Sequence, residues 1–171
     1  MAKGLSEYDI KFTGLKLGTH TFDFALNQKF FDEFEVTEIE GGELFVNLQL
    51  EKQSTMLIAK FHIEGQADST CDRCTDPLQI EIDYDDRLIY KFGDENFEDN
   101  EEVVVLTQAD DRINVAEPIY QFLILALPNK KVHPEGECNQ EMIDRINELS
   151  KSQNDDDDEI DPRWSALKDL N

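Results

Sequence analysis

The feature that most restricts the fold is the alternation of apolar and polar residues over the first two thirds of the chain. The alternation runs through residues 22–26, 44–50, 57–63 and 80–84, and glycine or polar residues separate one run from the next. Successive side chains of a strand point to opposite faces of a sheet, so such runs are typical of antiparallel strands with one buried and one solvated face. The sequence therefore predicts an antiparallel meander, which could curl into a barrel-like sheet.

Shorter patterns extend this predicted sheet. Residues 8–12 alternate in the same way and predict a strand that pairs with 22–26. The run at 80–84 continues through 88–92, and the two acids between them, at 85–86, predict a bulge. Three phenylalanines at helical spacing within 30–34 predict a short helix packed against the sheet.

The character of the chain changes beyond residue 93. Residues 94–102 carry six acids and no base, which predicts a mobile acidic loop, and apolar residues at 103–106 and 113–115 predict two brief strands. An apolar segment between Pro118 and Pro128 then predicts a buried helix, because proline suits a first helical turn and stops a helix elsewhere.

A second helix is predicted at 139–151, where Met142, Ile146 and Leu149 form one apolar stripe. With strands early and helices late, the fold class is α+β. A chain of 171 residues with 39% hydrophobic content suits one core, so residues 1–151 are expected to form a single domain.

The C-terminal segment is expected to extend beyond that domain. Residues 152–160 are acidic and predict a disordered linker, and residues 161–171 predict a short amphipathic helix. Asp161 can cap this helix, Pro162 suits its first turn, and Trp164 and Leu167 share one face. Trp164 either docks on its own domain or anchors a partner, and the acids beside it favour a basic partner.

The charge of the chain narrows the class of partner. It carries 39 Asp and Glu against 16 Lys and Arg, a formal net charge of −23. This field repels phosphate backbones and anionic lipid surfaces and attracts basic proteins, so we expect no direct binding to naked RNA and no membrane contact. The first residues lack the apolar core of a secretion signal, and a cytoplasmic protein is expected.

The three cysteines raise the question of a metal site. Cys71 and Cys74 are separated by two residues, and thiolates at this spacing can both face one zinc ion when the chain turns between two strands. His133 and Cys138 would complete a four-ligand set. The alternative, which the sequence alone favours, is a turn with two inert, partly buried thiols and an unrelated Cys138. A disulfide oxidoreductase is not expected, since a strand pattern follows Cys74 where an activating helix would have to begin.

Ordinary enzymatic motifs do not occur in this sequence. It has no glycine-rich phosphate loop, no nucleophile elbow and no paired-histidine metal motif, and its three histidines are scattered. We therefore expect a protein that is not an enzyme.

Three segments together resemble the YceD family. They are CDRC after a pair of strands, the apolar helix ending in ALP with a cysteine shortly beyond, and the terminal DPRWSALKDL. The resemblance is closest to the forms found in the Bacteroidetes. It carries the family's paired cysteines over to Cys71 and Cys74, its later cysteine to Cys138, and its terminal segment to Asp161, Pro162, Arg163, Trp164 and Leu167. Many relatives have further cysteines near the C-terminus and this chain does not, so a shared zinc site does not follow from the resemblance.

The resemblance implies a role in the synthesis, processing or stability of large-subunit ribosomal RNA. In this family the gene often lies beside that of a small, basic ribosomal protein. Combined with the charge, this gives the hypothesis of a non-catalytic factor that binds a basic ribosomal protein or a large-subunit assembly intermediate. The alternative is a zinc-binding structural or RNA-contacting module built on Cys71, Cys74 and Cys138.

Overall fold

The computed structural model describes residues 5–34, 38–93, 103–107 and 109–154, with side chains to residue 150. These residues form two compact units, one from the described parts of 1–70 and 77–131, the other from 71–76 and the described residues after 131. The acidic loop predicted at 94–102, most of the linker and the C-terminal helix lie outside the described residues. The predicted division into domains therefore stays a prediction.

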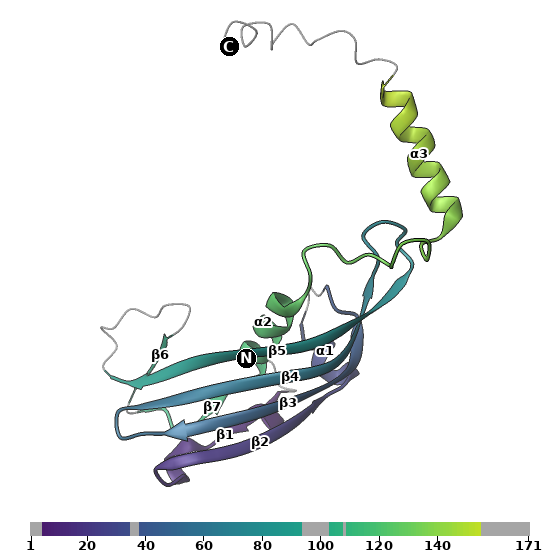
Figure 1. Ribbon diagram of the computed structural model, residues 1–171. Coiled ribbons are helices and arrows are strands. Elements are labelled where there is room, and N and C mark those ends of the chain that lie inside the picture. Colours follow the sequence, from purple (N-terminus) through teal and green to yellow (C-terminus); the bar gives the residue numbers. More distant parts are fainter. Residues whose placement is uncertain (1–4, 35–37, 94–102, 108, 155–171) are drawn as a thin grey trace, which may run out of the picture. The chain divides into compact units, whose positions relative to one another are not determined.

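The first unit is built on a five-stranded sheet with the order β2-β3-β4-β5-β6 (Figure 1). Its strands are β2 (Gly18–Leu26), β3 (Gly41–Lys52), β4 (Met56–Thr70), β5 (Pro77–Phe92) and β6 (Val103–Leu106). The first four pair antiparallel in chain order, and β6 is parallel to β5. The α+β class and the meander are confirmed.

The prediction that the sheet curls toward a barrel is wrong. The strands β2 and β6 form its two edges, and the sheet stays open. A barrel must pair its first strand with its last, but here helices cover the inner face. The aromatic ring of Phe61 on β4 meets that of Phe122 on a helix, with centroids 5.1 Å apart. Helical side chains thus fill the core that closure would otherwise enclose.

The register between β4 and β5 is unbroken from Met56 opposite Lys91 to Thr70 opposite Pro77. The bulge predicted at 85–86 is therefore wrong. Asp86 takes an inner-face position and accepts a hydrogen bond of 2.9 Å from the Tyr84 hydroxyl. This bond offsets part of the cost of the carboxylate, so the strand needs no extra residue.

The N-terminal segment pairs with a different partner from the one predicted. Short 3-10 helices, η1 (Ser6–Tyr8) and η2 (Phe12–Gly14), flank the two-residue strand β1 (Asp9–Ile10), which pairs with β7 (Ile113–Asn114) and not with β2. The alternating side chains are nevertheless buried: Tyr8, Ile10 and Phe12 are each at most 4% exposed. The pattern thus predicted burial correctly but not the element or its partner.

The described residues also form three α-helices: α1 (Gln28–Phe31), α2 (Ala116–Ala126) and, in the second unit, α3 (Gln140–Asn154). The Asn27 side chain caps α1 by accepting from the backbone N–H of Lys29, at 3.0 Å. Ile119 and Leu123 of α2 are fully buried, whereas Leu125 is 64% exposed, so the helix is amphipathic and not buried all round. Among the described residues, no helix combines the length and apolar character needed to span a bilayer.

Gly65 in β4 allows the backbones of β3 and β4 to approach closely. Its φ is +135°, and a Cβ there would overlap the carbonyl oxygen of Glu43. Gly65→Ala is expected to lower the free energy of unfolding by about 2–4 kcal/mol in urea denaturation. Gly14→Ala is the control, because a Cβ at Gly14 meets nothing within 4 Å. Equal unfolding midpoints for the two variants would contradict this explanation.

Candidate metal centre

Two loops of the second unit bring the cysteines together. Cys71 and Cys74 lie in the turn that joins β4 to β5, as predicted. The backbone N–H of Cys71 donates to the Asp76 carbonyl and that of Thr75 to the Cys71 carbonyl, each at 2.9 Å. Thr75 adopts a left-handed φ of 61°, which reverses the chain directly after Cys74. His133 and Cys138 come from the segment between α2 and α3.

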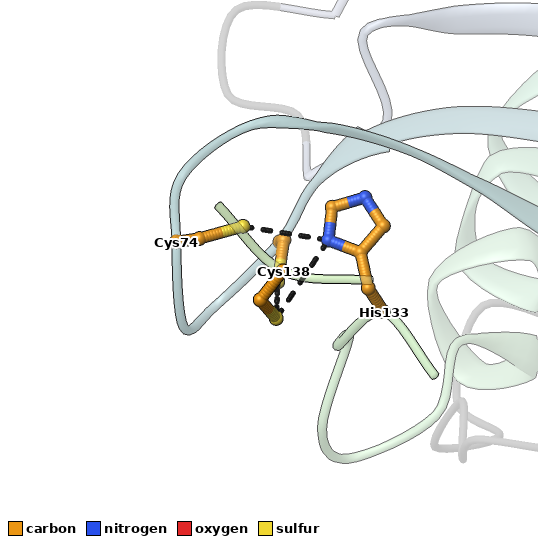
Figure 2. Close-up of side chains that lie close together, drawn as sticks. Cys74, His133 and Cys138 are labelled. Atoms are coloured by element: carbon orange, nitrogen blue, oxygen red, sulfur yellow. Dashed lines mark hydrogen bonds between the residues drawn. The ribbon is translucent and has the colours of Figure 1, made fainter. Parts of the chain in front are cut away.

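The four side chains converge on one point. Figure 2 labels three of them, Cys74, His133 and Cys138. The Cys74 sulfur lies 3.4 Å from His133 Nδ1, and the Cys138 sulfur lies 4.0 Å from the same nitrogen. The sulfurs of Cys71 and Cys138 are 4.0 Å apart. All four atoms lie within 4.8 Å of one another.

These separations fit a tetrahedral zinc ion. Zinc–sulfur bonds of about 2.3 Å and zinc–nitrogen bonds of about 2.0 Å place neighbouring ligands about 3.8 Å apart for two sulfurs and about 3.5 Å for sulfur and nitrogen. The closest contacts in the cluster are within a few tenths of an ångström of these values. Three cysteines and one histidine are also a typical donor set of structural zinc sites. The cluster could therefore hold a metal such as zinc.

The surroundings of Cys71 favour the thiolate, the form that binds metals. Burial raises the pKa of this thiol, but the backbone N–H groups of Cys74, Arg73 and His133 donate to the sulfur and outweigh burial, lowering the pKa to about 6. These donors stabilise the thiolate, which is the form of cysteine that binds a metal. Preorganised amide donors around a thiolate also orient it, as donors around metal ligands commonly do.

The pKa of Cys138 is raised, whereas that of Cys71 is lowered. Burial raises the pKa of the Cys138 thiol first, and hydrogen bonds and negative charge from Cys74 and Cys71 raise it further. Arg73 lies near, with its guanidinium Nη1 3.9 Å from the Cys138 sulfur. Ionisation of all three thiols at this distance would bring like charges together, and a divalent cation at their centre would offset that repulsion.

The structure thus changes the weight of the two interpretations of the cysteines. Cys71 and Cys74 are buried, at 1% and 0% exposure, but Cys138 contacts them and is not an unrelated packing residue. This contact brings Cys138 to the paired cysteines, as the predicted four-ligand set requires. The strand β5 follows Cys74, starting at Pro77, so no helix N-terminus lies there to activate a redox thiol. The partner-binding residues predicted at 161–167 lie outside the described residues.

A second group was missed by sequence reasoning. His62 on β4 lies beside Asp83 and Asp85 on β5, with His62 Nδ1 3.1 Å from an Asp85 carboxylate oxygen. Only strand pairing brings these residues together, so no spacing in the sequence signals the group. Both carboxylates are about four fifths exposed, which makes this a weaker metal candidate than the buried cysteines.

Comparison with known proteins bears on identity. A family model described as Large ribosomal RNA subunit accumulation protein YceD matches residues 59–171, which include all four members of the cysteine cluster. No curated protein and no solved structure matches the chain. The family match gives no support to a Bacteroidetes-type member. Because it covers more than half of the sequence, the chain belongs to the YceD family.

Proposed function

We propose that this protein is a non-catalytic cytoplasmic factor that supports the accumulation of large-subunit ribosomal RNA by binding a basic ribosomal protein or a large-subunit assembly intermediate. The family's description supplies the link to the large subunit. The observation that carries the choice of partner is the net charge of −23.

Electrostatics separates a protein partner from an RNA partner. Binding to naked RNA gains affinity from the release of counterions by clustered Lys and Arg, and this chain has 16 such residues against 39 acids. The same negative charge that repels RNA attracts a cationic protein over a long range and raises the rate of association. A basic ribosomal protein, which must itself be kept from binding RNA at random, suits this field.

The proposal predicts a role for the C-terminal segment in a pull-down of ribosomal proteins from a cell extract at moderate salt. Trp164→Ala, and separately neutralisation of the four acids at 155–158, should each reduce recovery, since a tryptophan anchor is commonly worth about tenfold or more in affinity. The same change in charge on α2 and α3, at Glu117, Glu141, Asp144 and Glu148, is the matched control. Recovery that is unchanged in both tail variants would count against this role.

A second function is supported by the cysteine cluster. The fit of Cys71, Cys74, His133 and Cys138 to a tetrahedral ion favours a zinc-stabilised module, in which zinc holds together the two loops that bear the ligands. Such a module could present a surface to RNA or protein. Metal content separates the candidates, because zinc-dependent folding without any recovery of ribosomal proteins would favour the second.

A further inference from the structure

The outer, solvated face of the sheet carries an exposed aromatic side chain, Phe45. Leu44 and Val46 point into the core at 1% exposure each, so Phe45 between them points outward and is 59% exposed. The register places Ala25 on β2 directly opposite Phe45, and Glu64 on β4 opposite its other side. A bulky aromatic therefore stands on the solvated face with a small neighbour on one side and a carboxylate on the other.

Carboxylates surround this phenylalanine in three adjoining rows of paired residues. One row holds Phe45, Glu64 and Asp83, and the rows on either side hold Glu43 with Glu81, and Asp23 with Asp85. These rows contain no Lys or Arg. His62 lies in the row of Asp85, with its imidazole 3.1 Å from Asp85 and 3.7 Å from Glu64. Lys and Arg appear in the next row, where Lys60 lies opposite Arg87. We call Phe45 and these six carboxylates the Phe45 face.

Two shallow hollows adjoin the ring of Phe45. The first, of about 510 Å³, is lined by Asp23 and Glu64 among others. The second, of about 520 Å³, is lined by Glu43 and Asp68. Ala25 and Phe45 line both, because alanine is too short to cover the aromatic ring. The Asn47 amide donates to Asp23 at 2.7 Å and holds that carboxylate at the edge of the first hollow.

We propose that the Phe45 face binds an arginine-rich segment of a basic protein, with a guanidinium over the ring of Phe45 and paired with Asp23 or Glu64. A cation over an aromatic ring gains from the ring quadrupole, and a carboxylate beside it adds charge-assisted hydrogen bonds. The inference rests on the proposed function and deepens it, since it gives the basic partner a docking surface on the folded domain in addition to the C-terminal segment.

Other occupants suit this surface less well. RNA phosphates would meet six carboxylates with His62 as the one basic side chain in these rows and no Lys or Arg. A second copy would bring two acidic faces together, which like-charge repulsion disfavours. A basic protein segment can place a cation over the exposed aromatic ring and pair with the carboxylates around it.

The test uses the full chain and a fluorescein-labelled oligoarginine peptide, titrated by fluorescence anisotropy at physiological ionic strength. Phe45→Ser should raise the Kd about tenfold while leaving the net charge unchanged. Leu17→Ser is the matched control, because Leu17 is 68% exposed, precedes β2 at the end far from Ala25, and should leave the Kd unchanged. Thermal melting checks that both variants remain folded.

A second pair of variants separates this site from general attraction to an acidic protein. Glu64→Gln with Asp83→Asn removes the same charge as Glu141→Gln with Asp144→Asn on α3, but only the first pair should weaken binding. Equal Kd values for Phe45→Ser and the unmodified chain, or equal weakening by the two double variants, would overturn the Phe45 face. Absence of binding by the unmodified chain would instead count against a basic partner altogether. Self-association that Phe45→Ser abolishes would overturn the proposed occupant and identify it as a second copy of this chain.

Discussion

Cys74→Ser is expected to reduce the zinc content of the purified protein from about one ion per chain to near zero, as measured by inductively coupled plasma mass spectrometry. Serine cannot supply the thiolate that a four-ligand zinc site needs, and loss of one of four ligands opens the tetrahedron. Because a zinc ion would join the turn at Cys71–Asp76 to the loop bearing His133, its loss should also expose this second unit to protease. Chelator treatment of the unmodified protein should have the same effect on proteolysis.

Two histidine variants provide the control for this prediction. His133→Asn should lose the metal, because His133 Nδ1 lies 3.4 Å from the Cys74 sulfur. His62→Asn should keep it, since His62 belongs to the separate, exposed group with Asp83 and Asp85. Metal-free, fully folded protein from zinc-supplemented cells would refute the zinc site. Zinc lost only from His62→Asn would move the site to the outer face of the sheet.

Phe61→Ala is expected to lower the free energy of unfolding by about 3–5 kcal/mol, a large part of the about 5–15 kcal/mol that stabilises a typical domain. Phe61 is 1% exposed and packs against Phe122 of α2, so truncation leaves a cavity between the sheet and the helix. Urea denaturation followed by circular dichroism measures the change.

The same substitution on the opposite face of the sheet is the control. Phe45→Ala removes the same atoms from a side chain that is 59% exposed and should cost less than about 0.5 kcal/mol. Binding of the oligoarginine peptide provides a second comparison. Phe45→Ala should weaken this binding although the protein remains stable. Equal losses of stability would mean that Phe45 is packed in solution and is not available as an anchor.

Periodicity predicted much of the sheet because it acts locally. The alternation at 44–50 and 57–63 correctly separates inward from outward side chains on β3 and β4, and it leaves Phe45 on the solvated side. The helical spacing of three phenylalanines within 30–34 predicted α1, and the apolar segment between Pro118 and Pro128 predicted α2. It failed at 85–86, where the composition of the strand changes but its geometry does not.

Partners distant in the sequence could not be predicted in the same way. Ile10 pairs with Ile113, and β6 joins β5 in parallel after the described chain resumes at residue 103. Both pairings depend on which surfaces remain unfilled once the meander has formed. The open edge of the sheet has the same origin, because helices rather than a closing strand cover the inner face.

The sequence by itself determined most of the inward and outward positions on the long strands and the acidic character of the chain, and it offered Cys71, Cys74, His133 and Cys138 as one of two interpretations of the cysteines. Only the tertiary structure decided that Cys138 lies 4.0 Å from Cys71 and that His62 lies against Asp85. The physical reason is the range of the forces: side-chain periodicity acts between neighbours along the chain, whereas ligand geometry arises only when segments distant in sequence come together in the folded protein.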